Sequence, residues 1–188
     1  MTLYFSSEGE RNVWYNVIQS ASNNIDILSN YRLLETIGVG KFATVRKAQL
    51  LEDESQYAAV KIISKRSLEA ADKINLYNEI SIHSTVHHPC IAKIIGIFET
   101  PERVFFVMKL MGEGDLFTHI SDNKTLDLPE ATHIAYKILK ALEYFKEFQI
   151  LHRDLKPENL LIEKENKRVK EVYVIDFGIA RYVDTRYR

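Results

Sequence analysis

The chain has 188 residues, 46% of them hydrophobic and 27% charged, which is the composition of an ordinary globular domain. Lys and Arg total 25 against 26 Asp and Glu, so the net charge of -1 gives no basic field for nucleic acid or an anionic membrane. The single cysteine, Cys90, excludes an internal disulfide bond and fits a reducing compartment. The first residues, MTLYFSSEGER, lack the basic start and apolar run of a signal peptide, so we expect a cytoplasmic protein.

The N-terminal segment, residues 1–24, has a helical pattern. Its apolar positions from Val13 to Ala21 recur with the spacing of one helix face, and Trp14 lies on that stripe. A polar run at 22–24 ends the pattern, and residues 25–30 are expected to form a linker.

A β-rich unit is predicted in residues 31–111, followed by a helical unit with short strands. The predicted strands are 31–38, 43–50, 57–63, 91–98 and 103–110, with one helix at about 67–86. Beyond Gly112 and Gly114 the pattern becomes helical, and a helix at 127–148 has Asp127 as its N-cap and Pro129 in its first turn. A strand at 168–178 follows, so the predicted fold class is α+β.

Gly38 and Gly40 lie in the stretch IGVGKFATV, between two predicted strands. Glycines at such a turn let the backbone approach a phosphate group closely. The stretch lacks the Gly-Lys-Ser/Thr of a P-loop, and no helix of a dinucleotide-binding fold follows it. Taken alone, the pattern fits a plain β-hairpin equally well.

Lys61 lies in the predicted strand AAVKII, where its apolar neighbours leave little polar surface. An exposed face is the usual place for a lysine, but here we expect an anionic partner. Glu79 offers one, because it shares the apolar face of the helix at 67–86 with Leu76 and His83. A buried carboxylate and a buried ammonium each cost several kcal/mol unless they are paired, so the sequence predicts a Lys61–Glu79 ion pair.

Side chains with complementary chemistry lie in the stretches HRDLKPEN and IDFG. Asp154 can accept a proton from a hydroxyl group, and Lys156 can neutralise a transferring phosphoryl group. Asn159 and Asp176 offer the oxygen ligands that hard cations prefer. A plain polar turn would leave this combination unexplained.

Together and in this order, these stretches resemble the protein kinase family, and the resemblance covers residues 31–188. It implies a bilobal fold with ATP bound between the lobes. The β-rich N-lobe at 31–111 is expected to be complete. The helical C-lobe at 112–188 is expected to be incomplete, because it ends just after the DFG motif.

The resemblance implies roles for single residues by their position. The expected catalytic residues are Lys61, its partner Glu79, Asp154 and Lys156, and Asn159 and Asp176 would hold Mg²⁺. The expected ATP contacts are Ile37, Gly38, Val39, Gly40, Lys41, Phe42, Ala43, Thr44, Val45, Ala59, Lys61, Met108, Lys109, Met111, Asp115 and Leu161.

Within that set, the adenine slot has an implied arrangement. Ile37 and Val45 would clamp the adenine, between Ala59 on one side and Leu161 on the other. Met108 would gate the back of the slot. The backbone of Lys109 and Met111 would bind the adenine edge, and Asp115 would bind the ribose.

HHPCI and DLKPENLLI are similar to the calcium/calmodulin-dependent kinase group, and IFETPERVFFVM most resembles the protein kinase D family. DLKPEN further implies Ser/Thr specificity. Residues 1–24 are similar to the last strand and helix of the pleckstrin-homology domain that protein kinase D carries. An unrelated amphipathic helix that packs on the kinase is an equal alternative. Contact with membrane lipid is expected only if an upstream pleckstrin-homology domain exists.

Some positions imply regulation or specificity. Asp115 and Glu158 match positions at which relatives bind an arginine three residues before the acceptor of a protein substrate; two solvated carboxylates are the alternative. His83 stands where an apolar spine residue is usual, and we interpret it as a tolerated core histidine; a pH-sensitive spine is the less favoured alternative. In related kinases the position of Arg153 pairs with a phosphorylated activation loop, which implies control by phosphorylation.

The kinase pattern normally continues beyond the DFG motif through an Ala-Pro-Glu and several helices. We interpret the end of the sequence as a C-terminal truncation that exposes apolar faces of the C-lobe. By its residues, the chain is predicted to be a Ser/Thr protein kinase that uses ATP and Mg²⁺, with the activity of the isolated chain left open. The alternative is a nucleotide-binding pseudokinase or a non-catalytic regulatory fragment, while a small-molecule kinase is disfavoured.

Overall fold

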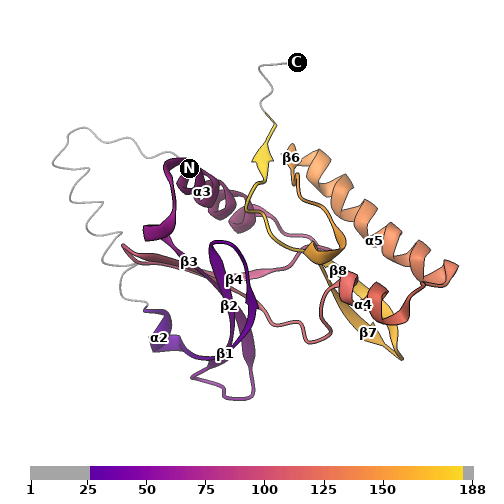
Figure 1. Ribbon diagram of the computed structural model, residues 1–188, viewed down its shortest axis with the longest axis horizontal. Coiled ribbons are helices and arrows are strands. Elements are labelled where there is room, and N and C mark those ends of the chain that lie inside the picture. The colour runs from indigo at the N-terminus through magenta and orange to yellow at the C-terminus, as the bar shows by residue number, and fades with distance from the viewer. Residues whose placement is uncertain (1–25, 184–188) are drawn as a thin grey trace.

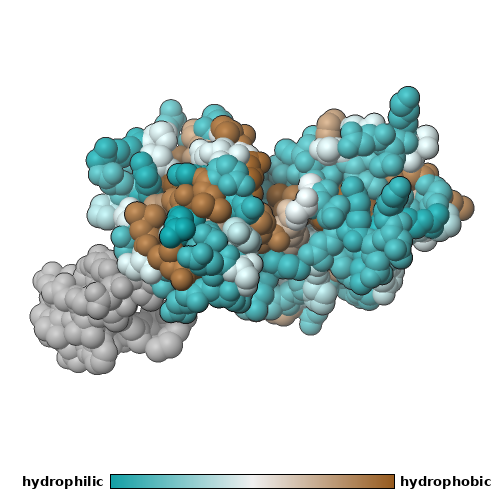
Figure 2. All heavy atoms as spheres, turned by 90° about the horizontal axis from the view of Figure 1, so that it is seen from below, coloured by the Kyte–Doolittle hydropathy of each residue, from teal (hydrophilic) through white to brown (hydrophobic). Residues whose placement is uncertain are grey.

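Two lobes make up residues 26–183, the part of the chain that the computed structural model describes (Figure 1). The chain crosses from the N-lobe to the C-lobe at residues 110–115, so the predicted bilobal α+β fold is confirmed. Figure 2 shows one face of the molecule, on which hydrophobic residues gather on the N-lobe while the C-lobe is largely hydrophilic. The predicted helix in residues 1–24 lies outside the described residues.

The N-lobe is built on a five-stranded antiparallel sheet with the order β1-β2-β3-β5-β4. Its strands are β1 Tyr31–Val39, β2 Ala43–Leu50, β3 Tyr57–Ser64, β4 Ile94–Glu99 and β5 Arg103–Lys109. All five predicted strands are confirmed. β4 begins later than predicted because Ile91 and Ala92 pair with the C-lobe instead: the Ala92 N–H donates to the Val174 carbonyl at 3.0 Å.

Residues 27–30 form a helical turn within the segment predicted to be a linker. This turn, α2 Ile27–Asn30, begins at Asp26, whose carboxylate accepts a hydrogen bond from the Leu28 N–H at 3.1 Å. Ile27 is buried and packs in the same cluster as Tyr31 and Val107 of the sheet. Residues 27–30 therefore belong with the N-lobe.

Helix α3, Ala70–Thr85, lies within the predicted range 67–86. It begins later than predicted because a 3-10 turn, η1 Lys65–Ser67, comes first. Its buried face carries Leu76, Glu79, Ile82 and His83. Leu76 packs in the N-lobe core and Ile82 in the C-lobe core, so this helix is anchored in both lobes.

The two C-lobe helices begin at side-chain caps. α4, Leu116–Asn123, begins at Asp115, and α5, Leu128–Glu147, begins at Asp127 as predicted. The Asp127 carboxylate accepts from the Glu130 N–H at 2.9 Å, and Pro129 lies in the first turn.

One face of α5 packs on the C-lobe core through Ile134, Ala141 and Phe145. Elsewhere on the helix Tyr136, Leu139 and Leu142 are 54%, 62% and 40% exposed. Within residues 26–183, no helix combines the length and apolarity needed to span a bilayer.

Two short strand pairs complete the described C-lobe. β6 Ile150–Leu151 pairs with β9 Arg181–Tyr182, and β7 Leu160–Glu165 pairs with β8 Arg168–Val174; a 3-10 turn, η2 Pro157–Asn159, precedes β7. The prediction of a strand at 168–178 is wrong at its end. β8 stops at Val174, because Asp176 has a φ of 63°, in the left-handed region outside extended structure.

Candidate active site

Lys61, Glu79 and Asp176 meet between the lobes. The Lys61 ammonium lies 2.7 Å from Glu79 Oε1 and 2.8 Å from Asp176 Oδ1. β3 supplies the lysine, α3 supplies the glutamate, and the segment after β8 supplies the aspartate. The predicted Lys61–Glu79 contact is present, and the fold brings Asp176 to the same ammonium from 115 residues away in the chain.

Burial and ion pairing oppose each other in this cluster. Burial disfavours the charged ammonium of Lys61, but Glu79 and Asp176 together outweigh it and raise the lysine pKa. Burial also acts against the charged Asp176 carboxylate, but Lys61 outweighs it and lowers that pKa. The pKa of Glu79, which is 3% exposed, is raised because burial dominates and one ammonium serves two carboxylates. The charge on Glu79 therefore depends on Lys61.

Asn159 organises the loop that carries Asp154. Its amide donates to the Asp154 backbone carbonyl at 2.8 Å and to Asp154 Oδ2 at 2.9 Å. The Lys156 ammonium lies 2.9 Å from the same Oδ2. Asp154 Oδ1 makes no hydrogen bond within residues 26–183, so one carboxylate oxygen can still accept a proton.

Asn159 and Asp176 lie side by side, because the Ile175 N–H donates to the Asn159 carbonyl at 3.0 Å. Asp176 uses Oδ1 for Lys61 and for the Gly178 N–H. In the described part of the chain, Asn159 Oδ1 and Asp176 Oδ2 make no hydrogen bond. Two available oxygens on neighbouring residues fit a hard divalent cation. No group of three or more His, Cys, Asp or Glu in residues 26–183 could hold a metal ion, so further ligands would come from phosphate or water.

The predicted phosphate-covering loop is the β1–β2 hairpin. Gly38 pairs with Val45, and the Gly40 N–H donates to the Ala43 carbonyl at 2.7 Å, which closes the turn. Neither glycine has a positive φ. The lack of a side chain, and not an unusual dihedral angle, therefore distinguishes these positions. The structure places all nine predicted loop residues on this hairpin: Ile37, Gly38, Val39, Gly40, Lys41, Phe42, Ala43, Thr44 and Val45.

The N-lobe wall of the predicted adenine slot is formed by three neighbouring strands. Lys61 of β3 pairs with Val45 of β2, and Ala59 of β3 pairs with Met108 of β5. Ala59 and Lys61 are two residues apart in one strand and so point to the same face. The sheet register thus gathers the four predicted side chains.

The crossing segment joins that wall to the C-lobe. It carries Lys109, Met111 and Asp115, and Asp115 forms a β-bridge with Leu161 of β7. The Asp115 carboxylate accepts from the Thr118 N–H at 2.7 Å and so caps α4. The structure therefore gives Asp115 a capping role that the sequence did not indicate, beside the ribose contact implied by the resemblance.

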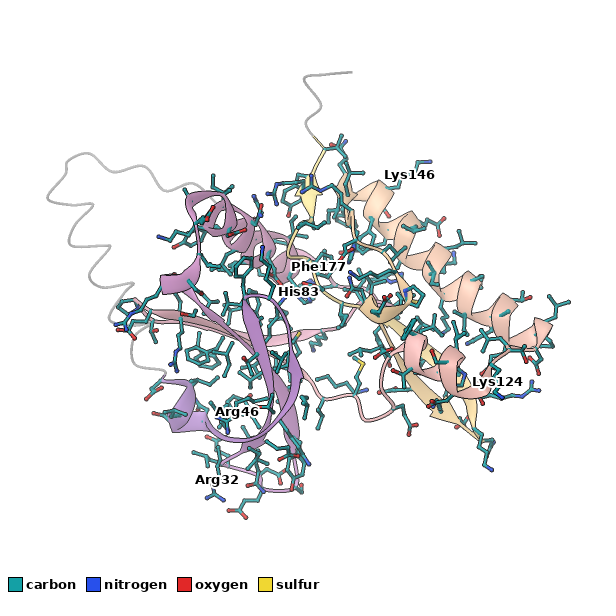
Figure 3. All side chains as sticks on the ribbon, in the orientation of Figure 1. Arg32, Arg46, His83, Lys124, Lys146 and Phe177 are labelled. Atoms are coloured by element: carbon teal, nitrogen blue, oxygen red, sulfur yellow. The ribbon has the colours of Figure 1, made fainter. Side chains whose placement is uncertain are left out.

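Phe177 fills a buried aromatic cluster that the sequence did not indicate. Figure 3 shows Phe177 beside His83, at a distance of 4.6 Å between ring centroids. The rings of His152 and Phe145 lie 5.1 and 5.8 Å from Phe177. His83 Nε2 donates to the Ala92 carbonyl at 2.9 Å, and burial lowers the pKa of His83 to about 4. His83 is therefore the neutral core histidine that was expected.

The segment after Asp176 is held against α3 and the catalytic loop. Arg153 Nε donates to the Ile179 carbonyl at 2.6 Å. The Arg181 guanidinium donates to Asn75 Oδ1, and the Tyr182 hydroxyl lies 3.1 Å from Thr85 Oγ1. Contact between Arg153 and a phosphorylated loop stays a prediction.

Comparison with known proteins agrees with this geometry. The family described as the protein kinase domain matches residues 31–188. Calcium/calmodulin-dependent protein kinase type 1 of Macrobrachium nipponense is 33% identical over 82% of this chain and 44% of the relative. Myosin light chain kinase A of Dictyostelium discoideum is 34% identical over 81% of this chain and 51% of the relative. Serine/threonine-protein kinase DCLK3 of Mus musculus is 35% identical over 84% of this chain and 20% of the relative.

The chain therefore spans between a fifth and about half of the length of these curated relatives. The family match covers the whole described fold from β1 onward and every predicted site residue. The chain belongs to the protein kinase family, and it is similar there to serine/threonine kinases of the calcium/calmodulin-dependent type.

Proposed function

We propose that the protein is an ATP-dependent serine/threonine kinase that transfers the γ-phosphoryl group of Mg·ATP to protein hydroxyls. The observation that carries the proposal is the cluster of Lys61, Glu79 and Asp176, which lies next to the Asp154–Asn159 loop. The names of the relatives, which are serine/threonine kinases, support the class of acceptor.

Binding of the nucleotide would use groups that the fold already holds in place. The Lys61 ammonium, fixed by Glu79, would bind the α- and β-phosphates, and the Gly38–Gly40 backbone would cover them. When bound through Asn159 and Asp176, Mg²⁺ would neutralise phosphate charge. Such catalysis consists mainly of positioning and of charge stabilisation.

Asp154 would then act on the acceptor. Its Oδ1 would take the proton of the serine or threonine hydroxyl, while the hydroxyl oxygen bonds to the γ-phosphorus and the bond to the ADP oxygen breaks. Asn159 and Lys156 hold Oδ2, so the carboxylate keeps one orientation during this step. The Lys156 ammonium would also offset the negative charge of the transferring group.

A basic substrate fits the acidic residues near this site. Asp115 begins α4 and Glu158 lies in η2, and these two elements pack together. The Asp115 carboxylate is already engaged by Thr118, at 2.7 Å from its N–H and 3.2 Å from its hydroxyl. Glu158 is exposed and would provide more of the attraction for an arginine three residues before the acceptor.

Three finer expectations stay predictions. They are the special likeness to protein kinase D, a pleckstrin-homology remnant in residues 1–24 with its conditional lipid contact, and a cytoplasmic location. The first 25 residues are outside the described part of the chain.

Transfer of labelled γ-phosphate to serine and threonine peptides tests the proposal. Asp154→Asn should abolish transfer and retain ATP binding, because the altered group faces the acceptor. Asp122→Asn, on the exposed surface of α4, is the matched control and should leave both unchanged. A wild-type protein that binds ATP but phosphorylates no peptide would instead support the nucleotide-binding pseudokinase.

A further inference from the structure

Three side chains outside the expected catalytic set form a polar cluster where the lobes join. The Lys109 ammonium lies 2.6 Å from Glu163 Oε1, and the Tyr173 hydroxyl donates to Glu163 Oε2 at 2.9 Å. The same ammonium lies 5.7 Å from the centre of the Tyr173 ring, within range of a cation–π interaction. Each oxygen of Glu163 therefore has its own donor, and Lys109 has two partners.

This cluster connects the two lobes. Lys109 is the last residue of β5, where it pairs with Ala58 in the N-lobe sheet. Glu163 and Tyr173 lie on β7 and β8 of the C-lobe. Tyr173 is also the strand partner of Leu161, the expected C-lobe wall of the adenine slot.

The crossing segment is thus fastened to β7 at both of its ends. At the C-lobe end, the Ile162 N–H donates to the Gly114 carbonyl at 3.1 Å. At the N-lobe end, the side-chain pair of Lys109 and Glu163 makes the attachment. Loss of that pair would remove this side-chain attachment at the N-lobe end.

The protonation states of Glu163 and Tyr173 at neutral pH favour the observed contacts. The Lys109 hydrogen bond lowers the pKa of the Glu163 carboxyl, and the Tyr173 hydrogen bond acts in the same direction against burial. Burial, together with the neighbouring Glu163 carboxylate, raises the pKa of Tyr173. The carboxylate is therefore charged while the phenol keeps the proton that it donates.

We propose that Lys109, Glu163 and Tyr173 form an interlobe clasp of positioning residues that fixes the N-lobe over β7 and thereby sets the affinity for ATP. The ATP part of this proposal rests on the proposed function, whereas the lobe-positioning part does not. The two walls of the adenine slot, Ala59 and Leu161, come from opposite lobes, so a looser junction separates them. Lys61 stays paired with Asp176, and Asp154 is held within its own C-lobe loop, so KM for ATP should change more than kcat.

Enzyme kinetics tests the ATP part. The side chains of Lys109 and Glu163 are 55% and 31% exposed, and such pairs have modest strength, so Lys109→Met and Glu163→Gln should each raise KM for ATP about two- to fivefold. The exchanged pair, Lys109→Glu with Glu163→Lys, should recover most of that loss. Lys170→Met is the matched control: its pair with Glu165, at 2.9 Å, lies within the same hairpin and joins no lobes, so KM should not change.

Spin-label distances test the lobe-positioning part without ATP. Labels on cysteines placed at Glu54 of the N-lobe and Asp122 of α4 report the separation of the lobes, and the native Cys90 is buried. The distance distribution should widen in Lys109→Met and in Glu163→Gln but not in Lys170→Met. An unchanged distribution would overturn the clasp, even if KM rose. A wild-type protein that binds no ATP would contradict the proposed function, while the label distances would still decide the clasp.

Discussion

Lys61 Nζ lies 2.7 Å from Glu79 Oε1, which joins the middle strand of the N-lobe sheet to a helix anchored in both lobes. A buried pair of this kind is costly to form and costly to break. It is therefore weak evidence for stability and stronger evidence for a positioning role. Because Asp176 reaches the same ammonium, a movement of α3 changes the charge balance at the expected metal ligand.

Glu79→Gln should lower phosphoryl transfer about a hundredfold, a typical cost of removing one preorganised charged group. Without the glutamate charge, Lys61 would be drawn toward Asp176 and away from the phosphates. Steady-state kcat/KM for ATP measures the effect. Glu69→Gln, at the exposed start of the same helix, is the control and should behave like wild type. A Glu79 variant with wild-type kcat/KM would show that the pair does not position Lys61.

His83 should make stability depend on pH. Its pKa is about 4 in the folded protein against an ordinary value of 6.5, so the unfolded chain binds the proton more readily. The stability contributed by neutral His83 is complete above about pH 6.5 and is lost as the pH falls toward about 4. Burial lowers the pKa of His152 too, which acts in the same direction.

Urea unfolding of wild type and His83→Leu isolates the His83 contribution. When the pH falls from about 7.5 to about 5.5, the free energy of unfolding of wild type should decrease by about 1 kcal/mol more than that of the variant. His87→Leu, an exposed position just after α3, is the control and should keep the wild-type pH dependence. If the free energy of unfolding depends on pH equally in wild type and in His83→Leu, then His83 is not a buried, neutral histidine.

The sequence predicted those parts of the site that depend on local periodicity. The apolar strand around Lys61 and the apolar stripe of α3 were enough to pair Lys61 with Glu79. Asp176 could be named from its motif, but its left-handed backbone could not be predicted, because no local pattern in the sequence requires it there. The buried position of Phe177 could not be predicted either, because Phe177 is not part of a periodic apolar pattern. The Lys109–Glu163 contact joins residues 54 apart, on different lobes, so no local pattern could indicate it.

Asn159→Asp should separate metal binding from catalysis. The variant keeps an oxygen ligand but loses the amide that donates to Asp154 at 2.8 and 2.9 Å, and it places two carboxylates together. We expect kcat to fall at least tenfold. The Mg²⁺ concentration needed for half-maximal rate should not rise. Magnesium titrations of the rate measure both quantities. A large rise in the required Mg²⁺ with unchanged kcat would show that the amide does not orient Asp154.

Glu158→Gln should weaken the preference for arginine three residues before the acceptor. Because the carboxylate is exposed, the expected loss of discrimination is about two- to fivefold. A peptide array that varies this position provides the measurement, with Glu165→Gln as a control on the exposed end of β7. If the wild-type protein gains nothing from arginine at that position, the proposed substrate preference is wrong.

Titration calorimetry of ATP in the presence of Mg²⁺ tests the central claim most directly, with wild type compared to Lys61→Met and to Lys146→Met, which lies on the last turn of α5 (Figure 3). The account predicts that wild type and Lys146→Met bind ATP alike. Lys61→Met should bind at least about tenfold more weakly, because a charge-assisted phosphate contact contributes about 1.5–3 kcal/mol. Equal affinities for all three proteins, or no ATP binding by wild type, would contradict the claim that the cluster of Lys61, Glu79 and Asp176 forms a nucleotide site.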